Sequence, residues 1–133
     1  MRHIADSRSE KGQTMVEFAM VLPILCVLLF GVIQFGILFN NYITLTDAVR
    51  AGARKAVVSR ALGAGGAVSA AQQAVQDSAT DLDKSKLTPI NVTSTWQRGD
   101  PVTVHAEYPY DISLLNWVIA SGHLKSTTTE RVE

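Results

Sequence analysis

The hydrophobic pattern of the chain is dominated by one long apolar run near its beginning. Between Phe18 and Phe39 no side chain is charged, and Pro23 and Gln34 are the main interruptions. These 22 residues (39 − 18 + 1) would extend about 33 Å as an α-helix, which matches the roughly 30 Å hydrocarbon core of a bilayer. The rest of the chain is too short to surround a helix that is apolar on every face. The run therefore predicts a transmembrane span at about 18–39.

The pattern predicts that this helix continues as an amphipathic segment, so that one long helix covers 13–60. Arg50, Arg54 and Lys55 occupy its polar faces. The opposite face carries small and apolar residues at helical spacing: Leu45, Ala48, Val49, Gly52, Ala53 and Ala56. Such a stripe suits close packing, against the chain's own domain in preference to a neighbouring subunit.

A break and a second helix are expected next. Closely spaced glycines at 63–66 should interrupt the helix, because glycine costs helix stability and permits a positive φ. A second helix then fits 68–82. Its apolar side would consist of Val68, Ala71, Val75, Ala79 and Leu82.

After residue 87 the pattern changes from helix to strand. Alternation predicts strands at 90–96 and 102–108, joined by a hairpin connection. In the second strand, which Pro109 should end, the inward residues would be Val102, Val104, Ala106 and Tyr108. The threonine-rich segment 123–132 is typical of a final strand. The sequence thus predicts an α+β fold, in which the long helix and the second helix pack on an antiparallel sheet of about three strands. Residues 61–133 would form the globular domain.

The apolar segment between these strands fits the alternating pattern poorly. Residues 112–120 have too little alternation for a half-exposed strand. They therefore predict a short helix or docking loop, with Trp117 and Ile119 buried.

Charge and cysteine content narrow the functional classes. The 133 residues carry 12 bases and 12 acids, so net charge indicates no nucleic-acid partner. Without residues 1–12 the balance is nine bases to ten acids, because three bases and two acids are removed. Cys26 lies in the apolar run and is interpreted as a small hydrophobe.

No enzyme, cofactor or metal site is expected. The histidines, His3, His105 and His123, have no nucleophile–base or metal-ligand spacing around them. The acids at positions 77, 81 and 83 lack the glycine and final glutamate of a calcium loop, so a solvated helix end is favoured.

The polar segment before the span is interpreted as a leader peptide at 1–12, because its charge balance is positive and it lacks hydrophobic periodicity. Glu17 stands at the entrance to the span. A carboxylate there is either a paired functional group or an acid in the headgroup layer, where the helix dipole favours it. Pro23 is expected to kink the span.

The leader and span together resemble a known signal. The stretch Lys11-Gly12-Gln13-Thr14-Met15-Val16-Glu17-Phe18 resembles the class III signal of type IV pilins, which a prepilin peptidase cuts after the glycine. Two segments are similar to TadE-like minor pilins, or pseudopilins, of tight-adherence (Flp) pili: "GQTMVEFAMVLPILCVLLFGVIQFG" and, after it, "LTDAVRAGARKA". The resemblance implies a pilin-like fold and cleavage between Gly12 and Gln13. It also implies that Glu17 sets the register of assembly, with Phe18 packing beside it.

The same resemblance implies a role in pilus assembly for surface attachment or secretion. The implied partners are a prepilin peptidase, other minor pilins, the major pilin, an inner-membrane assembly platform and membrane lipid. The implied location is the bacterial inner membrane, as a single-pass protein with a cytoplasmic N-terminus and a periplasmic C-terminal domain; entry into the extracellular pilus stays open. Gln13 replaces the phenylalanine of type IV pilins, which leaves N-terminal methylation open.

A second hypothesis uses the same span differently. An unprocessed, signal-anchored periplasmic binding module would also have a polar N-terminal segment and one apolar helix. In that case Gly12 and Glu17 would be replaceable as long as hydrophobicity is kept.

Overall fold

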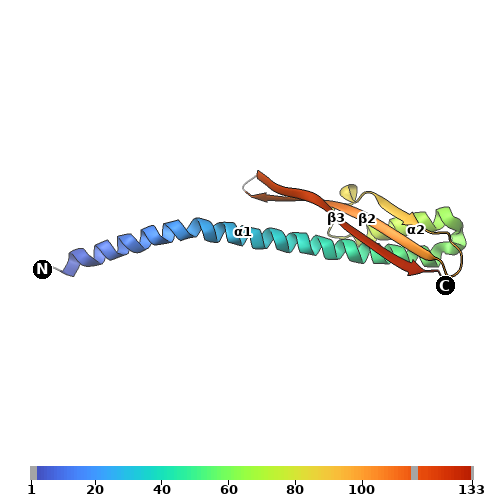
Figure 1. The fold of residues 1–133 in the computed structure, drawn as a ribbon, viewed down its shortest axis with the longest axis horizontal. Coiled ribbons are helices and arrows are strands. Elements are labelled where there is room, and N and C mark those ends of the chain that lie inside the picture. Colours follow the sequence, from blue (N-terminus) through green and yellow to red (C-terminus); the bar gives the residue numbers. More distant parts are fainter. Residues whose placement is uncertain (1–2, 115–116, 133) are drawn as a thin grey trace. The chain divides into compact units, whose positions relative to one another are not determined.

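The computed structural model describes residues 3–114 and 117–132, with side chains from Gly12 onward. In chain order the elements are helix α1 (His3–Val58), the 3₁₀ turn η1 (Ser59–Leu62), helix α2 (Gly63–Ser78), the 3₁₀ turn η2 (Lys84–Lys86) and strands β1 (Ile90–Thr93), β2 (Pro101–Leu114) and β3 (Trp117–Arg131) (Figure 1). The chain forms two compact units, Met1–Gly36 and Ile37–Glu133. The α+β class is confirmed.

Within its described residues the first unit is purely helical. The helix α1 already includes residues 3–12, so no break in secondary structure marks the predicted end of the leader. Met1 and Arg2 lie outside the described residues. Pro23 lies inside α1, which continues on both sides of it. Within the described residues, one helix is long and apolar enough to cross a membrane, which is consistent with the predicted span.

The second unit begins with the remainder of α1, from Ile37 to Val58. Leu45, Ala48, Val49, Ala53 and Ala56 are buried, as their helical spacing predicts. The chain then reverses through η1. Gly63 follows with φ +79°, a conformation that side chains other than glycine rarely adopt.

The predicted second helix exists, but its bounds differ. It begins at Gly63 and not at Val68, so Gly65 and Gly66 lie within its first turn. It ends at Ser78, although Ala79 and Leu82 beyond it remain buried. Only Gly63 has the positive φ that the break requires; the other two glycines tolerate helical geometry.

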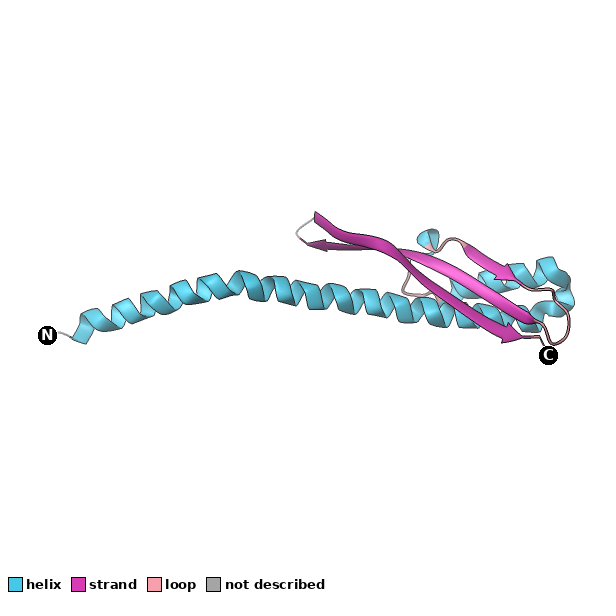
Figure 2. Ribbon diagram, in the orientation of Figure 1, coloured by secondary structure: helices cyan, strands magenta, loops and turns pink. Residues whose placement is uncertain are grey.

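The three strands form one antiparallel sheet in the order β1–β2–β3 (Figure 2). The strand β1 pairs with β2 from Ile90 opposite Ala106 to Thr93 opposite Thr103. The strand β3 pairs with β2 over almost the whole length of both, with an irregularity between Ile112 and Ser113. The first strand is therefore shorter than the predicted range 90–96, and the last strand begins earlier than His123, where it was predicted to start.

The core of the second unit lies between the helices and one face of the sheet. Alternate residues of β2, Val102, Val104 and Ala106, are buried there as predicted. They belong to one cluster with apolar residues of α1 and α2, together with Leu87 and Val132. The Gln72 side chain also donates a hydrogen bond from Nε2 to the Ile90 carbonyl, 3.2 Å away, which ties α2 to β1.

Two predictions about the sheet are wrong. Pro109 does not end β2; it lies inside the strand, opposite His123. The physical reason is that β1 pairs with β2 only as far as Ala106, so at Pro109 the second edge of β2 is free and the missing N–H leaves no bond unmade there.

The second wrong prediction concerns residues 112–120. Their described part is not a short helix or docking loop but the ends of β2 and β3. Trp117 and Ile119, expected to be buried, are exposed in the described chain. Leu115 and Asn116, which also belong to this prediction, lie outside the described residues.

Candidate functional site

The predicted processing residues lie on one continuous helix. Gln13 and Glu17 are four positions apart, which places them on the same face. The Gln13 side chain donates from Nε2 to Glu17 Oε1 at 3.2 Å. Phe18, the neighbour of Glu17, is exposed. The structure therefore brings Gln13 and Glu17 into contact; their roles in cleavage and register remain predictions.

The surroundings of Gly12 are open. A methyl group at Gly12 would find no atom within 4 Å outside its own helix backbone. The side chains that the structure describes, from Gly12 onward, thus supply no packing reason for glycine at this position. A requirement for glycine would have to come from a binding partner that contacts the backbone at this position closely.

Glu17 is well placed for a new amino group at Gln13. Cutting the bond between Gly12 and Gln13 would leave that group about 6 Å along the helix axis from Glu17, at about 1.5 Å per residue. A side chain of glutamate length reaches most of this distance. The arrangement therefore allows an ion pair within one chain, or between neighbouring chains whose helices are staggered.

The helix surface that follows is apolar on all sides. Met20, Leu25, Leu29, Ile33 and Phe35 are exposed, although they point in different directions around α1. Cys26 is exposed as well. A surface of this kind is unfavourable in water and requires lipid or apolar protein around it.

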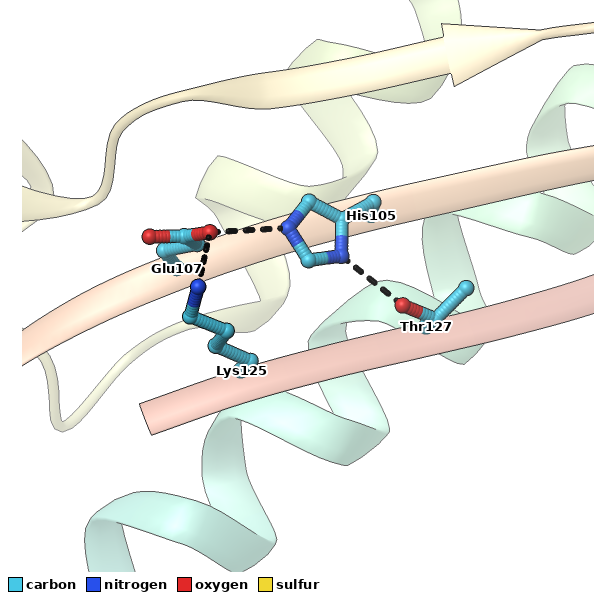
Figure 3. A network of polar contacts seen from close by, with 4 residues as sticks. All are labelled: His105, Glu107, Lys125 and Thr127. Carbon is cyan, nitrogen blue, oxygen red and sulfur yellow. Dashed lines mark hydrogen bonds and ion pairs between the residues drawn. The ribbon is translucent and has the colours of Figure 1, made fainter. Parts of the chain in front are cut away.

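A polar network on the sheet was missed by sequence reasoning. His105 and Glu107 of β2 lie beside Lys125 and Thr127 of β3 on the face opposite the core (Figure 3). His105 Nε2 and Glu107 Oε1 are 3.1 Å apart, and Lys125 Nζ lies 3.2 Å from the same oxygen. His105 Nδ1 lies 2.8 Å from Thr127 Oγ1. His105 is thus half-buried among partners, an arrangement that only the strand register could have revealed.

This network stabilises the ionised form of Glu107. Hydrogen bonds from His105 and Lys125 lower the pKa of Glu107 below its usual value of 4.5, because both stabilise the carboxylate. The network joins the two strands through Thr127 Oγ1, the His105 ring and the Glu107 carboxylate. It is best understood as a cross-strand contact that holds β2 and β3 in register.

The lowered pKa of Glu107 makes acid stability testable. Stability from a carboxylate whose pKa falls on folding is present above the unfolded-state value and is lost as pH decreases through the folded-state pKa. We expect the urea midpoint of the wild-type chain to exceed that of Glu107→Gln above pH 4.5, and the two curves to converge at lower pH. A constant difference across the whole range would contradict this assignment.

One of the aspartates considered for metal binding, Asp83, caps a short helical turn. Asp83 Oδ1 accepts hydrogen bonds from Ser85 N at 3.0 Å and Ser85 Oγ at 2.6 Å, which caps η2 and lowers the pKa of Asp83. Among the described residues, no group of three or more His, Cys, Asp or Glu side chains is arranged to hold a metal ion.

Comparison with known proteins agrees with the N-terminal pattern. Residues 12–54 match the family model described as TadE-like protein, a region that holds Gly12, Glu17, the span and the first part of the buried stripe. No curated protein and no solved structure matches the chain. The family indicates involvement in Tad/Flp pilus systems and, in general terms, partners from such a system. The chain therefore has a TadE-like region over residues 12–54 and is consistent with a TadE-like pilin-type protein.

Proposed function

We propose that this chain is a minor pilin, or pseudopilin, of a tight-adherence (Flp) pilus, and that a prepilin peptidase cleaves it after Gly12. The observation that carries the proposal is the TadE-like match, which begins at Gly12 and includes the complete apolar span. The folded unit from Ile37 to Glu133 adds support, because a subunit with a domain of this size is expected to be a minor component of the shaft.

In this proposal the leader keeps the precursor in the inner membrane with its N-terminus in the cytoplasm. The span serves first as a membrane anchor, where lipid covers its exposed apolar surface. After cleavage the same surface packs against the helices of other pilins on the assembly platform. Since the span is apolar on all sides, the helices of other pilins can replace the lipid around it without exposing its apolar surface to water.

Glu17 has the register role. Within an assembly it pairs with the amino group at Gln13 of its own chain or of a neighbour. A desolvated pair of this kind specifies the axial position of one helix against another more reliably than it adds net stability. The role of the chain is structural and not enzymatic.

Intact-mass and N-terminal mass spectrometry of the membrane-extracted chain test the proposal. We expect a mature chain beginning at Gln13 only when the prepilin peptidase is present. Gly12→Leu should block this cleavage, because a side chain would stand where the peptidase requires close approach to the backbone. Gly31→Ala is the matched control, since a methyl group at Gly31 also meets no atom within 4 Å.

The opposite result would identify the anchored module. A chain that keeps residues 1–12 both with and without the peptidase would exclude the pilin class. Normal cleavage of Gly12→Leu would show that the glycine is not the recognised residue.

A further inference from the structure

The end of the β2–β3 hairpin is apolar on both faces. Trp117 is 82% exposed, Val118 62% and Ile119 65%. No residue from Ile112 to Ala120 is charged. Strands of a sheet with one solvated face normally alternate, with polar side chains toward water. Here consecutive apolar residues face solvent, so this end of the hairpin is built for a non-aqueous environment.

Polarity changes in steps along the hairpin. The charged and hydroxyl side chains of the network, including Glu107 and Lys125, stand at the part that covers the core. Tyr108 and Tyr110 follow, with the Tyr110 ring lying across the strand against Gly122. Asp111, which is exposed, is the last charged side chain, and the apolar end follows it. Aromatic side chains at the boundary between charged and apolar residues are typical of the membrane interface.

The hairpin also has the length and direction to reach the membrane. Within the second unit, the end of β2 and the beginning of β3 point toward the earlier part of α1, whereas the end of β3 lies near the junction of α1 and α2 (Figure 1). A Cβ on Gly52 would be 3.7 Å from Val104 Cγ1, so these two residues stand side by side.

From Val104 to Leu114 the strand advances about 33 Å, at roughly 3.3 Å per residue. From Gly52 back to Phe39, the end of the predicted span, the helix covers only about 20 Å. The hairpin end is therefore long enough to extend beyond Phe39, the last residue of the predicted span.

We propose that the end of this hairpin, Ile112–Leu114 with Trp117–Ala120, inserts into the interfacial layer of the outer leaflet as a second membrane contact of the chain. The inserted part would hold the folded unit close against the membrane before assembly. Trp117 would lie at the boundary between headgroups and acyl chains, where water can still reach the open edges of the strands, with Tyr110 nearer the aqueous side. The inference rests on the span lying in a bilayer, but not on cleavage or on pilus assembly.

Site-directed spin labelling tests this contact in the full-length chain. In a Cys26→Ser background, a nitroxide is attached at Ile119→Cys, a position already exposed to solvent. Arg131→Cys, at the far end of the same strand and also exposed, is the matched control. The proteins are reconstituted in vesicles of phosphatidylethanolamine and phosphatidylglycerol. Collision with oxygen, which dissolves in lipid, is compared with collision with a water-soluble nickel chelate.

We expect the oxygen-to-nickel collision ratio at residue 119 to exceed that at residue 131 several-fold. Equal ratios at the two positions would place the hairpin end in water and overturn the proposal. Low collision with both reagents at residue 119 would show that protein covers it, as in contact with a second copy, and would overturn it as well.

Quenching of Trp117 by brominated lipid is a second measurement without a label. In Trp96→Phe, Trp117 is the sole tryptophan, and its emission should be quenched in vesicles that contain dibrominated phosphatidylcholine. In Trp117→Phe, the remaining Trp96 should not be quenched, because it packs against the core of the second unit. Unquenched Trp117 would contradict insertion.

Discussion

Replacing Glu17 by alanine is expected to abolish incorporation of this chain into pili while leaving cleavage and membrane insertion intact. In the proposed mechanism, the pair between Glu17 and the amino group at Gln13 would form only after cleavage, and it would matter only where lipid or protein has replaced water. Removing one partner of a desolvated pair costs about 3–5 kcal/mol, because the other charge stays buried without compensation. At about 1.4 kcal/mol per factor of ten, this corresponds to a loss of a hundredfold or more in assembly affinity.

The measurement compares two fractions of the same cells. Immunoblots of sheared pili report incorporation, and the mobility of the membrane-bound chain reports cleavage. We expect Glu17→Ala to be processed normally and to be missing from the pilus fraction. Glu17→Gln should behave in the same way, because it keeps the size of the side chain but not its charge.

The variant Gln13→Ala distinguishes the two candidate partners of Glu17, which are the Gln13 side chain and the amino group that cleavage would create. The structure shows a contact from the Gln13 side chain to Glu17, 3.2 Å long. This contact is exposed, so its contribution is expected to be a few tenths of a kcal/mol. The alanine variant loses it but keeps the backbone nitrogen that cleavage converts to an amino group. It should therefore assemble. Loss of assembly in Gln13→Ala with retention in Glu17→Gln would make the side-chain contact, and not the ion pair, the essential one.

The sequence predicts helical parts of this fold well because their signals are local. Phe18 to Phe39 is recognisable by length and lack of charge alone. The buried stripe from Leu45 to Ala56 follows from a spacing of three and four residues. The predicted inward residues of β2 are buried for the same reason, since alternation determines the face once one residue is assigned.

The hairpin could not be predicted because its reasons are not local. Residues 112–120 lack alternation, since both faces of the hairpin end are apolar, and the alternation rule assumes that one face meets water. Pro109 suggested an end to β2, but the sequence does not show that β1 stops at Ala106 and leaves that edge free. Both errors concern which strand lies beside which residue.

The candidate sites divide in the same manner. The predicted processing residues form a linear motif, so the sequence alone is enough to propose them: Gly12, Gln13, Glu17 and Phe18. The network of His105 and Glu107 with Thr127 and Lys125 depends on residues 18 and 22 positions apart (125 − 107 and 127 − 105) being brought together by the strand register. No pattern within either strand predicts this network.

Gly52 provides the largest expected effect on folding. A methyl group there would lie 2.4 Å from Val75 Cγ2 and 3.1 Å from the Ala71 carbonyl oxygen. Both neighbours belong to α2 and Val75 is fully buried, so neither has free space to move into. Here glycine is required by the close approach of α1 and α2, not by its backbone conformation.

We expect Gly52→Ala to lower the free energy of unfolding by about 1–3 kcal/mol, the usual cost of overpacking a core. The measurement is urea unfolding of the full-length chain in detergent micelles, followed by tryptophan fluorescence. Gly65→Ala is the control, because it lies in α2 and a methyl group there meets no atom within 4 Å. It should be neutral or stabilise by about 0.5–1 kcal/mol, since alanine favours helix over glycine.

A double-mutant cycle with Val75→Ala identifies the cause of the Gly52 effect. Val75→Ala removes Cγ2, the atom nearest to the added methyl group, so Gly52→Ala should be less destabilising in that background than in the wild-type chain. The remaining cost would come from the Ala71 carbonyl oxygen, which the second substitution does not move. Additive effects of the two substitutions would contradict the clash with Val75, because residues that do not contact each other contribute independently.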